Sequence, residues 1–168
     1  MIACILILIG VALRFLPHIP NVTPVAAIAL FSGVYISDKK LSVIIPLTLM
    51  VTSDLFLGFH DAVVFTWGSV VLISLIGVAL RKSSGMTKIL AGSLLSSLVF
   101  FVVTNFGVWL VGWYPQNMQG LSSCFIAAIP FFRYFLSGTL IYSAVFFGSF
   151  ALAEKWAKGT RLETALLK

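Results

Sequence analysis

Two charged side chains, Asp54 and Arg133, stand where a helix does not favour their charge. Asp54 comes one turn before the predicted C-terminal end of an apolar helix, and Arg133 falls in the predicted first turn of another. A helix dipole disfavours an anion at the first position and a cation at the second. Ionisable residues inside long apolar segments are functional candidates. Two interpretations stay open: the two residues pair with each other, or Arg133 binds an anionic group of a ligand.

A second candidate site is a stripe of one amide and two indoles, formed by Asn105, Trp109 and Trp113. Residues spaced by four share one face of a helix. Such a face suits a flat, polar-edged small molecule, because the rings offer stacking area and the amide fixes orientation. Trp67, inside a neighbouring predicted helix, is a further candidate. The alternative is an aromatic belt at the membrane surface, with an interhelical hydrogen bond for Asn105.

The two histidines, His18 and His60, lie in predicted connections rather than inside helices. With Asp54 and Asp61 they allow a haem or metal site, which stays open as an alternative. Because no His-x3-His or Cys-x2-Cys spacing occurs, we predict no metal and no cofactor. The chain also lacks the Gly-x4-Gly-Lys-Ser/Thr phosphate loop and a hydrolase-like Ser/His/Asp order. We therefore predict that the protein is not an enzyme.

The elements that position these side chains follow from a very apolar composition. Of the 168 residues, 60% are hydrophobic and 10% are charged, whereas soluble domains carry about 25% charged residues. A soluble fold this apolar could not cover its core, so lipid is the predicted solvent. The net charge is +6, but the basic residues follow the ends of apolar segments. We predict contact with membrane lipid and no binding of nucleic acid.

The basic residues also predict the topology. Most of the 11 Lys and Arg residues fall in alternate gaps between apolar segments, and basic loops stay on the cytoplasmic side during insertion. We predict an all-α, polytopic membrane protein: one domain over residues 1–168, with six transmembrane helices and cytoplasmic N and C termini. A long outer loop, 113–130, carries an apolar second half that suits a short surface helix. The predicted spans are about 2–16, 22–37, 41–58, 61–80, 88–112 and 131–156.

Some polar and small residues have ordinary structural explanations. Arg14 lies at the predicted C-terminal end of the first span, where the helix dipole favours a cation. Asp61 suits the N-cap of the fourth span. Ala29 and Gly33 have the small-xxx-small spacing that lets helix backbones approach closely in lipid. We expect this pair to pack within the bundle.

Four stretches of the chain carry a family resemblance, and together they span most of its length. They resemble a family of small uncharacterised bacterial membrane proteins named as transporters, which is similar to the substrate-binding S components of energy-coupling factor (ECF) vitamin transporters. The resemblance implies a six-helix bundle in the bacterial plasma membrane, an outward-facing pocket, a vitamin-like ligand and an energising membrane subunit with ATPases. The stretches are Phe15–Gly33, Ser53–His60, Thr104–Trp109 and Ala128–Arg133.

The first predicted span departs from typical S components. Those proteins carry an Ala-x3-Ala contact motif on their first helix, whereas Ile2–Ala12 has none. A different partner, or none, therefore stays open.

The sequence thus predicts a substrate-binding membrane subunit for uptake of a small polar or heteroaromatic solute. The outer loop 113–130 would cover the pocket, and a partner would supply the energy. The alternative is a structural or assembly subunit of a larger membrane complex, without a ligand of its own. The predicted site residues are Asn105, Trp109, Arg133, Trp67 and Asp54.

Overall fold

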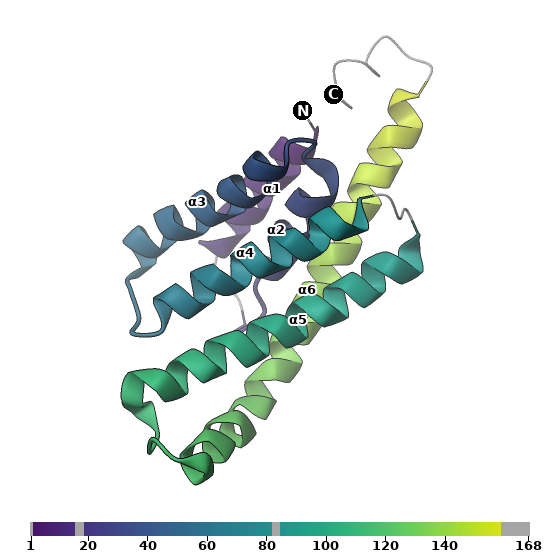
Figure 1. The fold of residues 1–168 in the computed structure, drawn as a ribbon. Helices are drawn as coiled ribbons and strands as arrows, with labels where there is room; N and C mark the ends of the chain where they lie inside the picture. Colours follow the sequence, from purple (N-terminus) through teal and green to yellow (C-terminus); the bar gives the residue numbers. More distant parts are fainter. Residues whose placement is uncertain (1, 16–18, 82–84, 159–168) are drawn as a thin grey trace.

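The computed structural model describes residues 2–15, 19–81 and 85–158, and it is helical throughout, with no strand in this part of the chain. This confirms the all-α prediction. The helices pack side by side into an elongated bundle (Figure 1). A π-helical turn, Trp109–Trp113, continues α5. The helices are α1 (Ile2–Arg14), α2 (Val25–Tyr35), α3 (Lys39–Leu57), α4 (Val63–Leu80), α5 (Met86–Val108) and α6 (Met118–Ala157).

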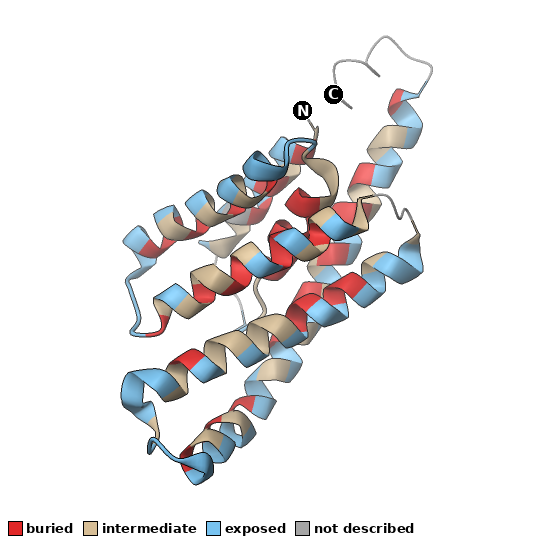
Figure 2. Ribbon diagram, in the orientation of Figure 1, coloured by how far each residue is buried: buried red, intermediate tan, exposed pale blue. Residues whose placement is uncertain are grey.

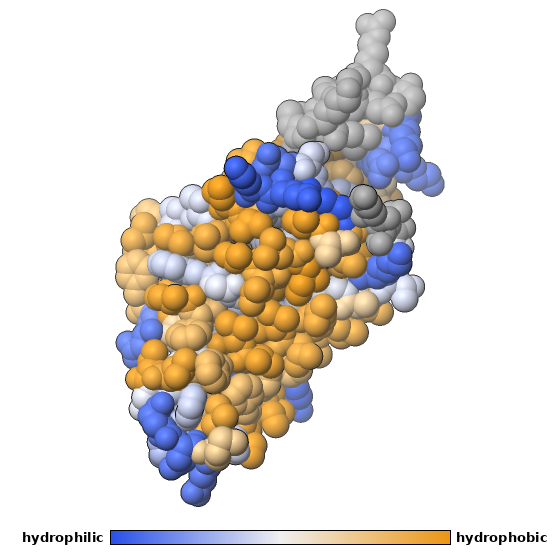
Figure 3. Space-filling view, viewed as in Figure 1, coloured by the Kyte–Doolittle hydropathy of each residue, from blue (hydrophilic) through white to orange (hydrophobic). Residues whose placement is uncertain are grey.

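Four of the described helices, α3, α4, α5 with its π-turn, and α6, are long and apolar enough to cross a membrane. Their outer faces expose many large apolar side chains. The molecular surface is apolar across its middle and hydrophilic toward both ends (Figure 3). α1 and α2 lie where the first two spans are predicted, but they have only 13 and 11 residues. At 1.5 Å per residue they reach about 20 and 17 Å, short of a ~30 Å hydrocarbon layer.

The short helix α2 is the centre of the bundle. Each residue from Ala26 to Gly33 is buried, and α2 contacts all five other α-helices (Figure 2). Its closest neighbour is α4: a Cβ atom added at Gly33 would lie 2.3 Å from the carbonyl oxygen of Ser74 and 2.7 Å from the Cα of Gly77. The expectation that Ala29 and Gly33 serve packing within the bundle is confirmed.

Arg81 holds the C-terminal end of α2. Its guanidinium donates hydrogen bonds of 2.5–2.7 Å to three backbone carbonyls, those of Gly33, Ile36 and Ser37. The last carbonyls of a helix have no partner within the helix. A cation near them is further favoured by the helix dipole. Arg81 therefore joins the end of α4 to the end of α2.

We expect Arg81→Gln to destabilise the protein by about 1.5–3 kcal/mol, because its charged hydrogen bonds to the carbonyls at the end of α2 are lost. Lys88→Gln is the matched control: it removes a basic side chain at the same end of the bundle, but Lys88 is exposed. Thermal unfolding in detergent measures the difference. Equal unfolding temperatures for the two variants would contradict this role of Arg81.

The predicted outer loop 113–130 is wrong in its extent, although its second half, 121–129, is helical as expected. α6 runs unbroken from Met118 to Ala157 with Pro130 inside it, so the connection from α5 contains only residues 114–117. Asn117 caps α6, since its side chain accepts a hydrogen bond from the Gly120 amide. At 40 residues the helix is about 60 Å long. The loop that was predicted to cover a pocket is therefore the first part of a helix.

Basic residues gather at one end of the bundle. α3 and α5 begin there, α4 and α6 end there, and α1 begins nearby (Figure 1). We call this the basic end, and the end with the α3–α4 and α5–α6 connections the distal end. The alternation predicted from the sequence thus holds for the described helices. The basic end carries Lys39, Lys40, Arg81, Lys88, Lys155 and Lys158.

Candidate functional site

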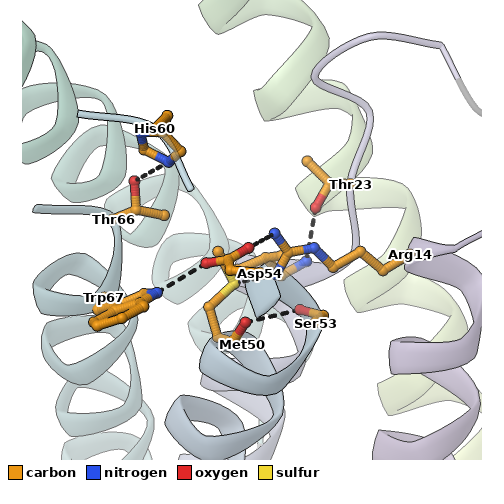
Figure 4. Close-up of polar contacts among 9 residues, drawn as sticks. Arg14, Thr23, Met50, Ser53, Asp54, His60, Thr66 and Trp67 are labelled. Carbon is orange, nitrogen blue, oxygen red and sulfur yellow. Dashed lines mark hydrogen bonds and ion pairs between the residues drawn. The ribbon is translucent and has the colours of Figure 1, made fainter. Parts of the chain in front are cut away.

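A buried aspartate near the distal end joins three helices. The Oδ1 atom of Asp54, on α3, accepts a hydrogen bond from an Arg14 NH group at 2.5 Å, and Oδ2 accepts one from the Trp67 indole at 2.8 Å. Arg14 ends α1 and Trp67 lies on α4, and they approach the carboxylate from opposite sides (Figure 4). Asp54 is 3% exposed. The unfavourable position of an anion at the end of α3 is offset by these two donors.

Of the two interpretations left open, the pairing of Asp54 with Arg133 is wrong, because the partner of Asp54 is Arg14. Arg133 is exposed in the middle of α6 and lines no cavity among the described residues. Because α6 begins at Met118, Arg133 is also not in a first turn, so the dipole argument for it no longer applies. Sequence reasoning identified Arg14 but assigned it to the water-facing end of a span. Its guanidinium instead turns into the bundle, where its side chain is 15% exposed.

A cavity of about 410 Å³ lies beside the ion pair, and we call it the Arg14 cavity. One wall is the start of α2 with the residues before it, and the other walls come from α3, α4 and α5. Its lining mixes one cation, one imidazole and three threonine hydroxyls with apolar side chains. The lining residues are Arg14, Thr23, Val25, Met50, Leu57, His60, Thr66, Phe100 and Thr104.

A second cavity, of about 330 Å³, lies between α5, α6 and the segment before α2, and we call it the Asn105 cavity. It is lined mainly by phenylalanine rings, among them Phe100, which stacks on Phe135 with ring centroids 4.1 Å apart. Asn105 donates a hydrogen bond to the Phe101 carbonyl at 2.8 Å. Both cavities share Phe100 and Thr104. The two cavities are therefore neighbours on α5. Asn105, one of the predicted binding residues, lines the second of them.

The predicted stripe along α5 does not form one face of a pocket. Trp109 lines neither cavity, and its indole donates a hydrogen bond of 3.0 Å to the Pro115 carbonyl. Trp113, 68% exposed, donates to Asp61 at 2.9 Å. The Trp109 indole turns to the α5–α6 connection instead of a cavity. The π-turn Trp109–Trp113 contains Gly112, whose φ of 91° only glycine adopts readily. It shifts the register of Trp113 relative to Asn105, and the Trp113 indole ties the end of α5 to the α3–α4 connection.

The part of the chain that the structure describes contains no group of three His, Cys, Asp or Glu side chains placed for a metal ion, so Asp61 and His60 belong to no such group there. Asp61 accepts the bond from Trp113, and the N-cap of α4 is Ala62. The predicted capping role of Asp61 is therefore wrong. The ring of His60 lies 3.4 Å from the Thr66 hydroxyl at the wall of the Arg14 cavity. His18 falls outside the described residues.

Sequence reasoning missed several wall residues of the two cavities. Thr66, Thr104 and Thr23 were not distinguishable in the sequence, because threonines that hydrogen-bond to their own helix are frequent in membrane segments. Met50 looked like an ordinary apolar residue, yet its sulfur accepts a hydrogen bond from Arg14. The available signal was the spacing of Met50 and Asp54, which places both on one face of α3.

The comparison with known proteins gives a family and no function. No curated protein and no solved structure matches the chain significantly. Residues 1–162 match the profile of a family of unknown function, DUF6580. Because this match covers nearly the whole sequence, the chain belongs to the DUF6580 family.

Proposed function

We propose that this protein is a substrate-binding membrane protein that captures a small polar or heteroaromatic, vitamin-like solute in its distal cavities for uptake. The observation that carries the proposal is the pair of cavities, about 330 and 410 Å³, that meet at Phe100 and Thr104. Sites for small ligands are typically of this size and combine apolar walls with a few polar groups. Asn105, the threonines and Arg14 supply the polar groups.

The backbone before α2 supports the same proposal. Asn21 has a φ of 65°, and both Asn21 and Thr23 line a cavity. This segment packs against the middle of α6, where a Cβ at Gly138 would lie 3.0 Å from the Cα of Val22. Non-helical backbone at membrane depth is tolerated where protein buries it or where it lines a water-filled cavity. Transporters place substrate sites at such interrupted helices.

The proposed orientation puts the basic end in the cytoplasm of a bacterial cell and the distal end on the outer side of its plasma membrane. All six helices then form the six-span bundle, with N and C termini inside. The short α2 is surrounded by neighbouring helices, whereas α1 exposes apolar side chains such as Leu8. In this proposal the arrangement would resemble that of ECF S components, and the energy for uptake would come from a partner membrane subunit with ATPases.

Thr104→Val tests the shared wall of the two cavities. The Thr104 hydroxyl donates to the Phe100 carbonyl at 2.7 Å, which leaves its oxygen free to accept a bond from a ligand. We expect the variant to bind about 3- to 10-fold more weakly, the effect of one lost hydrogen bond. Native mass spectrometry of gently purified protein should therefore find less bound small molecule in Thr104→Val than in wild type.

Thr52→Val is the matched control for this experiment. Thr52 makes the same kind of bond, 2.7 Å to the Thr48 carbonyl, but it is exposed on α3 and lines neither cavity. Its occupancy should equal that of the wild type. Wild-type protein without any bound molecule, or equal occupancy in all three proteins, would reject solute capture at these cavities.

A further inference from the structure

Arg14 has more hydrogen-bond donors than the described protein satisfies. A guanidinium carries five N–H donors. Asp54 Oδ1 and the sulfur of Met50 accept two of them, and Figure 4 draws a third hydrogen bond, between the guanidinium and Thr23. A thioether is a weak acceptor. The Arg14 side chain is only 15% exposed. Buried charged groups are normally fully hydrogen-bonded, so a thioether is an unusual partner for it.

The same guanidinium is the charged wall of the Arg14 cavity. None of the described acidic residues, Asp38, Asp54, Asp61 and Glu154, lines that cavity or the Asn105 cavity. The other polar groups facing the Arg14 cavity are His60 and the hydroxyls of Thr23, Thr66 and Thr104. The Thr104 hydroxyl already donates to the Phe100 carbonyl. A wall with one fixed cation, the hydroxyls of Thr23 and Thr66, and no lining acid is nevertheless complementary to an acidic group.

We infer that the solute carries a carboxylate, which binds the N–H groups of Arg14 that now face Met50 and the cavity. This inference rests on the proposed function and names the chemical class of its ligand. Asp54 remains in place when the solute binds, because the Trp67 indole holds its second oxygen at 2.8 Å. The guanidinium then lies between two carboxylates and contacts each through different N–H groups. The flexible Met50 side chain is the group that moves aside.

Matched pairs of small aromatic acids and amides provide the probes: benzoate with benzamide, and nicotinate with nicotinamide. Each pair has the same shape and differs in charge at neutral pH. In detergent at pH 7.5, we expect the acids to raise the unfolding temperature of wild-type protein at concentrations about tenfold lower than the amides. Quenching of tryptophan fluorescence gives a second readout, because Trp67 bonds to Asp54.

Two variants test whether the preference for acids over amides depends on Arg14. Arg14→Gln alone leaves Asp54 buried without its cation, so the decisive variant is the double substitution Arg14→Gln with Asp54→Asn, which removes both charges and keeps hydrogen-bonding side chains. In the double variant the acid preference should disappear while the amides still bind. Met50→Leu, which removes the sulfur acceptor and keeps the volume, should bind the acids at least as well as wild type.

The outcomes separate this inference from the proposed function. The carboxylate inference is overturned if an amide binds as well as its acid, or if the double variant still prefers acids. Neither result contradicts solute capture. The failure of every acid and amide to affect wild-type protein overturns the carboxylate inference. Solute capture itself is then decided by the bound molecule in wild type, Thr104→Val and Thr52→Val.

Discussion

Asp54→Ala should destabilise the protein more than any other single loss of a polar side chain described above. The substitution leaves the Arg14 guanidinium buried beside a thioether, and it removes the acceptor of the Trp67 indole. Breaking one partner of a buried ion pair costs about 3–5 kcal/mol. For a chain of this length, that corresponds to a fall in unfolding temperature of about 10 °C. Thermal unfolding in detergent, followed by size-exclusion chromatography, measures it.

Asp61→Ala is the control for this prediction, because Asp61 also accepts a bond from a tryptophan indole, that of Trp113. Asp61 is exposed, so its loss should cost less than about 1 kcal/mol. The double variant Arg14→Gln with Asp54→Asn should recover much of the stability that Asp54→Ala loses. Similar effects of Asp54→Ala and Asp61→Ala would show that the buried pair has no special role in stability.

Gly77→Ala should cost about 3 kcal/mol, at the upper end of overpacking effects. A Cβ atom at this position would lie 2.4 Å from the Leu30 carbonyl oxygen and 2.8 Å from the Gly33 Cα. Both neighbours are backbone atoms, so no side-chain rotation relieves the contact, and α2 and α4 must separate. The expected result is a fall in unfolding temperature of about 6–12 °C in the same detergent assay.

Gly68→Ala provides a control on the same helix. A Cβ at Gly68 meets no atom within 4 Å. Replacing glycine by alanine inside a helix favours the helix by up to about 1 kcal/mol. Gly68→Ala should therefore leave the unfolding temperature unchanged or raise it slightly. Equal losses for the two alanine variants would mean that the α2–α4 contact is looser than the structure indicates.

Hydrophobic periodicity and charge predicted the helices whose ends carry strong signals. The predicted spans 41–58 and 61–80 differ from α3 and α4 by two residues at most. The prediction failed at α6, because a proline is common in the first turn of a helix and Pro130 therefore resembles a helix start. A proline inside a helix removes one hydrogen bond and is usually destabilising. Here Asn117 starts the helix 13 residues earlier, a signal that the sequence contained and that Pro130 obscured.

The candidate site was less predictable than the fold, because its contacts join helices that are distant in sequence. The sequence placed Asp54 at an unusual position and Arg14 at a favourable one, but it could not say which cation lies beside Asp54. Which cation lies beside Asp54 depends on the rotation of α1 about its axis and on the true start of α6. Likewise the sequence did not show that the Trp109 indole bonds to the Pro115 carbonyl, or that a π-turn, Trp109–Trp113, shifts Trp113 off the face of Asn105.

The position of α2 has a consequence for the synthesis of this membrane protein. α2 leaves the ribosome second, yet the rings that enclose its Phe31, namely Phe146, Phe147 and Phe150, belong to the last helix. Until those residues have been translated, α2 lacks the length to cross the bilayer and lacks the wall that α6 contributes. The bundle is thus completed only at the end of translation. A nascent chain that is released early exposes the apolar surface of α2, which quality-control proteases can recognise.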